Sequence, residues 1–230
     1  MNTFSIATPA ADLSIRTSIA DLVVYKPIWQ VRPGIKTPLI IWRYGKPELV
    51  MGMWGLRSST AYNSVHMLRV LKSRPWNVLI RTHRCAIPAN CIITEKNGVA
   101  YLIRLPQHRL FLLGGVYQQK GDQFHYTILD TESPDLLHPV AENIPVIIHN
   151  NHIQKWLEHR ELDSIFHFAD KTGNNYFDYF KVNAKILDPK ENSRDLLIPQ
   201  GMTHAQYQER QKQVMALSFE KERANRRNGK

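Results

Sequence analysis

The sequence predicts an α+β protein built on a largely antiparallel β-sheet. Short segments rich in β-branched or aromatic residues follow one another along the middle of the chain, and polar turns separate them. Helical spacing of apolar residues occurs only between or beyond these segments, which argues against a regular alternation of strand and helix. With 230 residues, 43% of them apolar, the chain can form one substantial core. We expect a domain over residues 1–202 and a basic helix or tail over residues 203–230.

The first expected element is a helix within residues 9–24, where Leu13, Ile19 and Leu22 stand near helical spacing. Further helices are expected at 64–74 and 152–160. The predicted strands are residues 37–43, 48–54, 77–83, 85–93, 99–104, 109–117, 124–130 and 177–184, with polar turns at 44–47 and 120–122. After Gly201, the Thr203 side chain and Gln206 three residues later predict the capped start of a C-terminal helix.

Positive charge is concentrated in one part of the sequence. The formal net charge is +10, and residues 49–121 hold ten basic side chains against a single acid, Glu95. Residues 122–202 reverse the sign, with seven basic and thirteen acidic side chains. A concentrated basic segment favours a polyanionic partner such as nucleic acid. The alternative is that the acidic segment lies alongside the basic one and neutralises it.

Several common kinds of site have no support in the sequence. The motifs of P-loop, dinucleotide-binding, zinc-protease and serine-hydrolase sites are absent. His149 and His152 lack a nearby third ligand, so a capping or surface role is favoured over metal binding. Cys85 and Cys91 match neither a zinc set nor a redox pair, and we expect inert, buried thiols that share one strand face. We therefore expect no cofactor, no metal, no membrane association and a cytoplasmic location.

The order of several motifs is more specific than any one of them. YKPIWQVRPGIKTPLII at 25–41 precedes MWGLRSS at 53–59, and Asn63 stands before RCAIPANCIITEK at 84–96. FLLGGVY at 111–117 and TILDTESPDLLHPVAENIPVII at 127–148 follow. This series resembles the SRAP family, the SOS response-associated peptidases that process abasic sites in single-stranded DNA. The resemblance covers roughly residues 1–200 and lies mostly in the framework.

The resemblance implies a mixed fold around a barrel-like antiparallel sheet with flanking helices, and a basic groove for single-stranded DNA. The chemistry of the family uses a cysteine directly after the initiator methionine. Its freed α-amine attacks the aldehyde of the abasic sugar, and its thiol closes a stable ring. An asparagine holds this terminus, while a glutamate and a histidine move protons.

Most of these catalytic positions are substituted in this sequence. Asn2 stands at the nucleophile position, and its amide cannot act as a thiolate. Thr94 stands where the family has the glutamate, and Ala141 stands where it has the histidine. Asn143 replaces an arginine of the family that contacts DNA, whereas Asn63 matches the family's asparagine. We therefore expect a degenerate member that has lost the covalent chemistry and the self-processing peptidase activity.

The hypothesis that follows is non-covalent binding of single-stranded or abasic DNA in the SOS or DNA-damage response. Phosphate contacts are predicted for the basic side chains of the middle segment, Arg57, Lys72, Arg74, Arg81 and Arg84. The resemblance places Trp29, Arg32 and Trp54 near the groove, where aromatic faces stack on bases.

Two alternatives stay open. One is an abasic-site lyase that forms a Schiff base through the Met1 amine or a lysine. The other is a protein-interaction module that uses the same groove for a peptide. The sequence leaves the oligomeric state undetermined.

Overall fold

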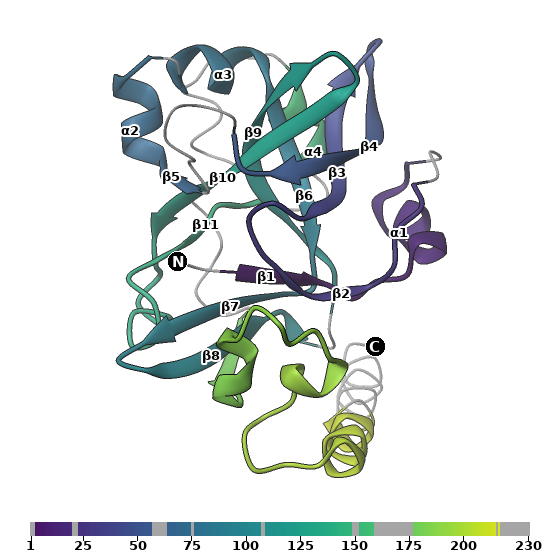
Figure 1. Ribbon diagram of the computed structural model, residues 1–230, viewed down its shortest axis with the longest axis vertical. Coiled ribbons are helices and arrows are strands. Elements are labelled where there is room, and N and C mark those ends of the chain that lie inside the picture. The colour runs from purple at the N-terminus through teal and green to yellow at the C-terminus, as the bar shows by residue number, and fades with distance from the viewer. Residues whose placement is uncertain are drawn as a thin grey trace, which may run out of the picture.

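Strands dominate the computed structural model, which describes residues 3–19, 23–56, 64–74, 76–106, 109–148, 152–158, 177–214 and 216. The predicted α+β class is confirmed, with short helices flanking two sheets (Figure 1). The strands are β1 (Thr3–Ile6), β2 (Ile28–Val31), β3 (Lys36–Arg43), β4 (Lys46–Trp54), β5 (Ser64–His66), β6 (Arg84–Ala89), β7 (Cys91–Lys96), β8 (Val99–Arg104), β9 (Phe111–Lys120), β10 (Gln123–Glu132), β11 (Asn143–Pro145), β12 (Ile147–Ile148) and β13 (Asp178–Lys181).

The larger sheet closes into a barrel. Strand β9 pairs with β6 on one side and with β10 on the other, so β10, β4, β3, β6 and β9 form a ring. Every pairing in this ring is antiparallel except that of β10 with β4. The turn between β3 and β4 has positive φ at Tyr44 and Gly45, as a tight hairpin of the right twist requires. The largely antiparallel, barrel-like sheet is confirmed.

The smaller sheet has the strand order β13, β8, β7, β1, β2. The chain enters it directly from the barrel, because β6 ends at Ala89 and β7 begins at Cys91. Asn90 lies between them, and its Oδ1 accepts hydrogen bonds from the backbone N–H groups of Ala7 (2.7 Å) and Thr8 (3.0 Å). The single strand predicted at 85–93 is therefore wrong: it is two strands that belong to different sheets.

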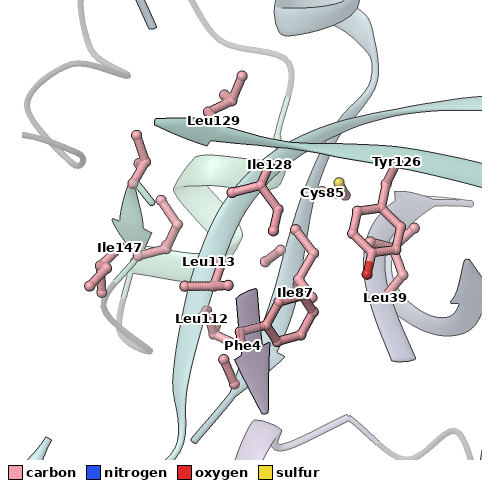
Figure 2. Packing of buried hydrophobic residues seen from close by; sticks show 14 of the residues in the cluster. Phe4, Leu39, Cys85, Ile87, Leu112, Leu113, Tyr126, Ile128, Leu129 and Ile147 are labelled. Carbon is pink, nitrogen blue, oxygen red and sulfur yellow. The ribbon is translucent and has the colours of Figure 1, made fainter. Parts of the chain in front are cut away.

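The core fills the barrel and extends to the smaller sheet. Figure 2 shows Ile87, Leu112, Leu113 and Ile128 gathered between the barrel strands, with Phe4 of β1 reaching the same cluster. The rings of Phe4 and Trp54 lie 5.2 Å apart and join the two sheets. Burial of these apolar side chains supplies the main driving force for folding.

The helices are short and lie outside the barrel. They are α1 (Ala10–Thr17), α2 (Met67–Lys72), α3 (Trp76–Thr82) and α4 (Ile153–Leu157), with 3-10 turns η3 (Ala184–Leu187) and η4 (Arg194–Leu197) and a further helix over residues 204–214. The strand predicted at 77–83 is wrong, because Trp76, Leu79 and Ile80 are buried at the i, i+3, i+4 spacing of a helix. The helix predicted at 64–74 begins as a strand, β5, which pairs with β10. None of the described helices is long and apolar enough to span a membrane.

The helix over 204–214 begins with the predicted cap. Thr203 Oγ1 accepts from the Gln206 N–H (3.3 Å), and Gln206 Oε1 accepts from the Thr203 N–H (2.9 Å). The buried Tyr207 attaches this helix to the smaller sheet, where its hydroxyl accepts a hydrogen bond from Arg104. The division of the chain at residue 202 stays a prediction.

Closure of the barrel depends on a glycine in β9, which gives the first prediction. A Cβ on Gly115 would lie 2.6 Å from the Thr127 carbonyl oxygen and 2.8 Å from Ile87 Cδ1. Gly115→Ala is expected to lower the free energy of unfolding by about 3 kcal/mol, because the overpacked barrel must shift its backbone. Urea denaturation followed by circular dichroism measures the change.

Gly98→Ala is the matched control. Gly98 has a positive φ of +76° and nothing within 4 Å of an added Cβ, so its replacement is expected to cost about 1 kcal/mol for the strained backbone alone. An equal loss of unfolding free energy in the two variants would contradict the close approach of Thr127 and Ile87 to Gly115.

Candidate functional site

A cavity of about 410 Å³ brings together positions that are far apart in the sequence. Thr94 enters it from β7, and Ala141 enters it from the turn before β11. The resemblance predicted that these two positions correspond to the glutamate and the histidine of the family. The fold therefore gathers the expected catalytic positions into one place, although it fills them with different side chains. The cavity is lined by Ser64, Thr94, Glu95, Lys96, Asn97, Asp130, Val140, Ala141, Glu142 and Asn143.

The side chains at the two family positions cannot move protons near neutral pH. Thr94 and Ala141 are both buried, and they present a hydroxyl and a methyl group. General acid–base catalysis needs a group whose pKa lies near the working pH, and neither side chain provides one. Asn2 and Asn63, the nucleophile and asparagine positions, lie outside the described residues, as does Arg57.

The cavity carries more negative than positive charge. Glu95, Asp130 and Glu142 line it, against Lys96. Glu95 Oε1 accepts from the Gly98 N–H (2.8 Å), and Lys96 Nζ donates to the His138 carbonyl oxygen (2.7 Å). Like charges repel, so these carboxylates would disfavour a phosphate placed in this cavity.

Asp130 is a carboxyl group of this cavity that the sequence analysis missed. It lies near the end of β10 and is partly buried. Burial raises the pKa of its carboxyl above the ordinary value, and a hydrogen bond with the Ser64 side chain opposes that effect. The available signal was an acid directly after the apolar run of β10, which places a carboxyl at the end of a core strand.

Three of the predicted phosphate contacts are on the surface. Lys72 ends α2, Arg74 follows it, and Arg81 lies in the last turn of α3; all three are exposed. In Figure 1, α2 and α3 cover the end of the barrel where β5 and β10 pair. Strand β5 begins at Ser64, which lines the cavity, and α2 follows directly after β5, so α2 starts close to the cavity.

Two predicted contacts are buried, and the predictions for them are wrong. Trp54 is 1% exposed and packs on Phe4, so its faces are not open to a base. Arg84 is also 1% exposed, and burial lowers its pKa to about 10. Its guanidinium donates to the backbone carbonyl oxygens of Ile80, Trp156 and Glu158, which attaches α4 to the barrel.

Trp29 and Arg32 lie near a different part of the molecule from the first cavity. Arg32 Nη2 donates to the Leu187 carbonyl oxygen (2.5 Å). The Trp29 N–H donates to Asn192 Oδ1 (2.9 Å), and its half-buried ring lines a second cavity. The groove position that the resemblance suggested for these residues is therefore not the cavity of Thr94 and Ala141.

The two cysteines are buried in separate clusters. Cys85 packs in the barrel core, whereas Cys91 packs beside the smaller sheet, 2.9 Å from the Ser5 hydroxyl. The prediction that the two thiols share one strand face is wrong, because Cys85 and Cys91 lie on different strands, which Asn90 separates. Burial raises the pKa of the Cys91 thiol to about 12, and it raises that of Cys85 as well. Among the described residues, no cluster of His, Cys, Asp or Glu side chains has the makeup of a metal site.

Comparison with known protein families matches residues 3–189 to SOS response associated peptidase, SRAP. The chain belongs to the SRAP family. Two curated SRAP relatives come from Bacillus subtilis strain 168. "Abasic site processing protein YoaM" is 22% identical and covers 75% of this chain and 85% of its own length. "Abasic site processing protein YoqW" is 21% identical and covers 75% and 86%.

Solved structures support the SRAP fold. A protein from Bacteroides thetaiotaomicron aligns with a TM-score of 0.71 at 14% identity, over 86% of this chain and 98% of its own. A phage-related protein from Bordetella bronchiseptica aligns with a TM-score of 0.66 at 14% identity, over 80% and 94%. At these identities the likeness shows the fold alone.

The buried thiols give the second prediction. At pH 8 about 10⁻⁴ of a thiol with a pKa near 12 is ionised, and the thiolate is the reactive form. Native protein is therefore expected to resist alkylation by iodoacetamide, whereas protein unfolded in guanidinium chloride should gain two adducts. Intact-mass spectrometry measures both. Rapid labelling of native Cys91 would contradict its buried position and would show that its thiol is reactive in the folded protein.

Proposed function

We propose that this SRAP-family chain binds single-stranded DNA without forming a covalent bond to it, as a cytoplasmic protein of the DNA-damage response. One observation carries the loss of chemistry: the cavity that joins Thr94 and Ala141 has no acid or base at either position. The sequence has Asn2 at the nucleophile position, which supports the same conclusion. The relatives named for abasic site processing support DNA as the partner.

The surface of α2 and α3 is the part of the chain that we assign to the DNA backbone. Lys72, Arg74 and Arg81 are exposed there, and exposed cations bind phosphates by releasing counterions. The acidic cavity near the start of α2 repels phosphate. A strand held on α2 and α3 therefore presents to the cavity an uncharged part of the chain, such as the sugar of an abasic site.

The third prediction concerns salt. Binding of a fluorescent single-stranded oligonucleotide is expected to weaken as salt rises, and anisotropy titrations give the slope of log affinity against log salt. The variant Lys72→Gln, Arg74→Gln, Arg81→Gln is expected to reduce this slope by about 2, because each lost phosphate contact contributes about 0.7 on single strands.

A matched control removes the same charge elsewhere. Lys181, Lys185 and Lys190 are exposed beyond the barrel, and their replacement by Gln should leave the slope unchanged. An affinity that does not change with salt, or an equal reduction of the slope in the two triple variants, would reject the assigned surface. A band that survives denaturing electrophoresis with abasic DNA would reject the non-covalent proposal.

A second candidate function is favoured by Asp130 and Lys96, which line the same cavity. A lysine amine condenses with an abasic aldehyde to form an imine and water. A neighbouring carboxyl with a raised pKa can supply the proton for that water and later remove one from the sugar, so that the strand breaks by elimination. In this second candidate function, the chain is an abasic-site lyase that needs no cysteine.

Borohydride trapping separates the two candidates and gives the fourth prediction. Borohydride reduces an imine to a stable amine, so a lyase leaves a cross-linked band on abasic oligonucleotide. Non-covalent binding predicts no such band. If a band forms, its disappearance in Lys96→Arg and its slower appearance in Asp130→Asn would establish the lyase. A band that persists in both variants would assign the amine to another residue.

A further inference from the structure

A second cavity, of about 740 Å³, lies on the other side of the smaller sheet from the core. Its walls are β1 and β2 on one side and η4 with the helix over 204–214 on the other. In Figure 1 these last elements lie beneath β2 and beside β8. The cavity shares no lining residue with the cavity of Thr94 and Ala141. Its volume falls in the range of sites for small organic ligands.

Part of the lining of this second cavity is apolar. Trp29, Leu102, Leu197 and Ile198 contribute to it. The backbone of Trp29 is fixed by its hydrogen bond to Asn192 Oδ1 (2.9 Å), which joins β2 to the segment before η4. A fixed aromatic face beside aliphatic side chains is suited to stacking against a planar ring.

The lining is also cationic. Arg104, Arg194 and Lys212 line the cavity, and no carboxylate is among the described residues that do so. The guanidinium of Arg104 is buried, 5.0 Å from the Phe180 ring centre and 5.4 Å from that of Tyr207, and it donates to the Tyr207 hydroxyl. Arg194 and Lys212 are exposed at the edge. The charge of the lining therefore complements an anion.

The floor is built from groups that already have hydrogen-bond partners. Asn90 Oδ1 accepts from Ala7 and Thr8, and Asn90 Nδ2 donates to the Thr8 hydroxyl (3.0 Å). The Ser5 hydroxyl and the Cys91 thiol lie 2.9 Å apart in a hydrogen bond. A ligand therefore meets a preformed floor and does not have to satisfy these groups, which lowers the ordering cost of binding.

We propose that the second cavity binds a small aromatic anion. Its planar ring lies against Trp29, and its phosphate or carboxylate lies between Arg194 and Lys212, with the buried charge of Arg104 behind it. Nucleotides and aromatic acids share this chemistry. The site is additional to the DNA surface proposed on α2 and α3, and neither depends on the other.

Isothermal titration tests the proposal with four probes on the full chain. Thymidine 5′-monophosphate and indole-3-acetate each combine a ring with an anion, and both are expected to bind one per chain. Thymidine lacks the charge and inorganic phosphate lacks the ring, so each should bind at least about tenfold more weakly. Binding of the nucleotide alone would assign a phosphate ligand, and binding of the indole acid alone would assign a carboxylate.

Variants locate the binding and give the fifth prediction. Arg194→Gln with Lys212→Gln changes exposed side chains only and is expected to weaken binding about tenfold. Trp29→Leu is expected to weaken the ring-bearing anions but not inorganic phosphate. Lys36→Gln with Lys46→Gln is the control, because it removes the same charge from exposed positions on β3 and β4.

The proposal fails on either of two results. One is that no ring-bearing anion gives saturable binding up to about 1 mM. The other is that the Arg194 and Lys212 variant binds as the control does. Binding of an oligothymidylate that the Arg194 and Lys212 variant weakens, with no binding of the free monophosphate, would assign the cavity to nucleic acid and would also overturn the proposal.

Discussion

The passage of the chain from β6 to β7 at Asn90 is the constraint on which both cavities depend. The Asn90 side chain accepts hydrogen bonds from two backbone N–H groups of the segment after β1. These bonds fix the end of β1 to the point where the chain leaves the barrel. Strand β1 then pairs with β7, and Phe4 carries the contact to Trp54 in the barrel. Because β7 runs in the smaller sheet, Thr94 reaches the first cavity and Cys91 reaches the second.

The strands of the barrel were predictable from the sequence because their apolar runs are bounded by clear turns. The helix α3 was not, because its seven residues, WNVLIRT, are too few to distinguish a helix from a strand by periodicity. The burial of Leu79 and Ile80 beside an exposed Val78 depends on packing against β6 and β9, which is tertiary information. Strands β1 and β2 could not be predicted for the same reason. They are short, and their extended form depends on the pairing of β1 with β2 and with β7.

Charge along the sequence predicted a basic surface, but it could not distinguish exposed from buried cations. Lys72 and Arg74 are exposed, whereas Arg84, ten residues later, is enclosed by carbonyl oxygens that attach α4. Arginine suits such a site because its planar group donates in several directions at once. Asp130 was missed because its surroundings depend on neighbours that the fold brings to it, Ser64 and Thr94, which are distant in the sequence.

The SRAP fold can persist here because the residues that build it differ from those at its catalytic positions. Trp156 is fully buried and its Nε1 donates to the Cys85 carbonyl oxygen (2.8 Å), so a change there would leave a void and an unpaired carbonyl in the core. Thr94 and Ala141 instead face a cavity, where a smaller side chain removes few contacts. Substitution at these two positions is therefore expected to cost less stability than substitution in the core. The two cavities also differ in charge: Glu95, Asp130 and Glu142 line the first, and the described cavity suited to an anion is the second one, across β7.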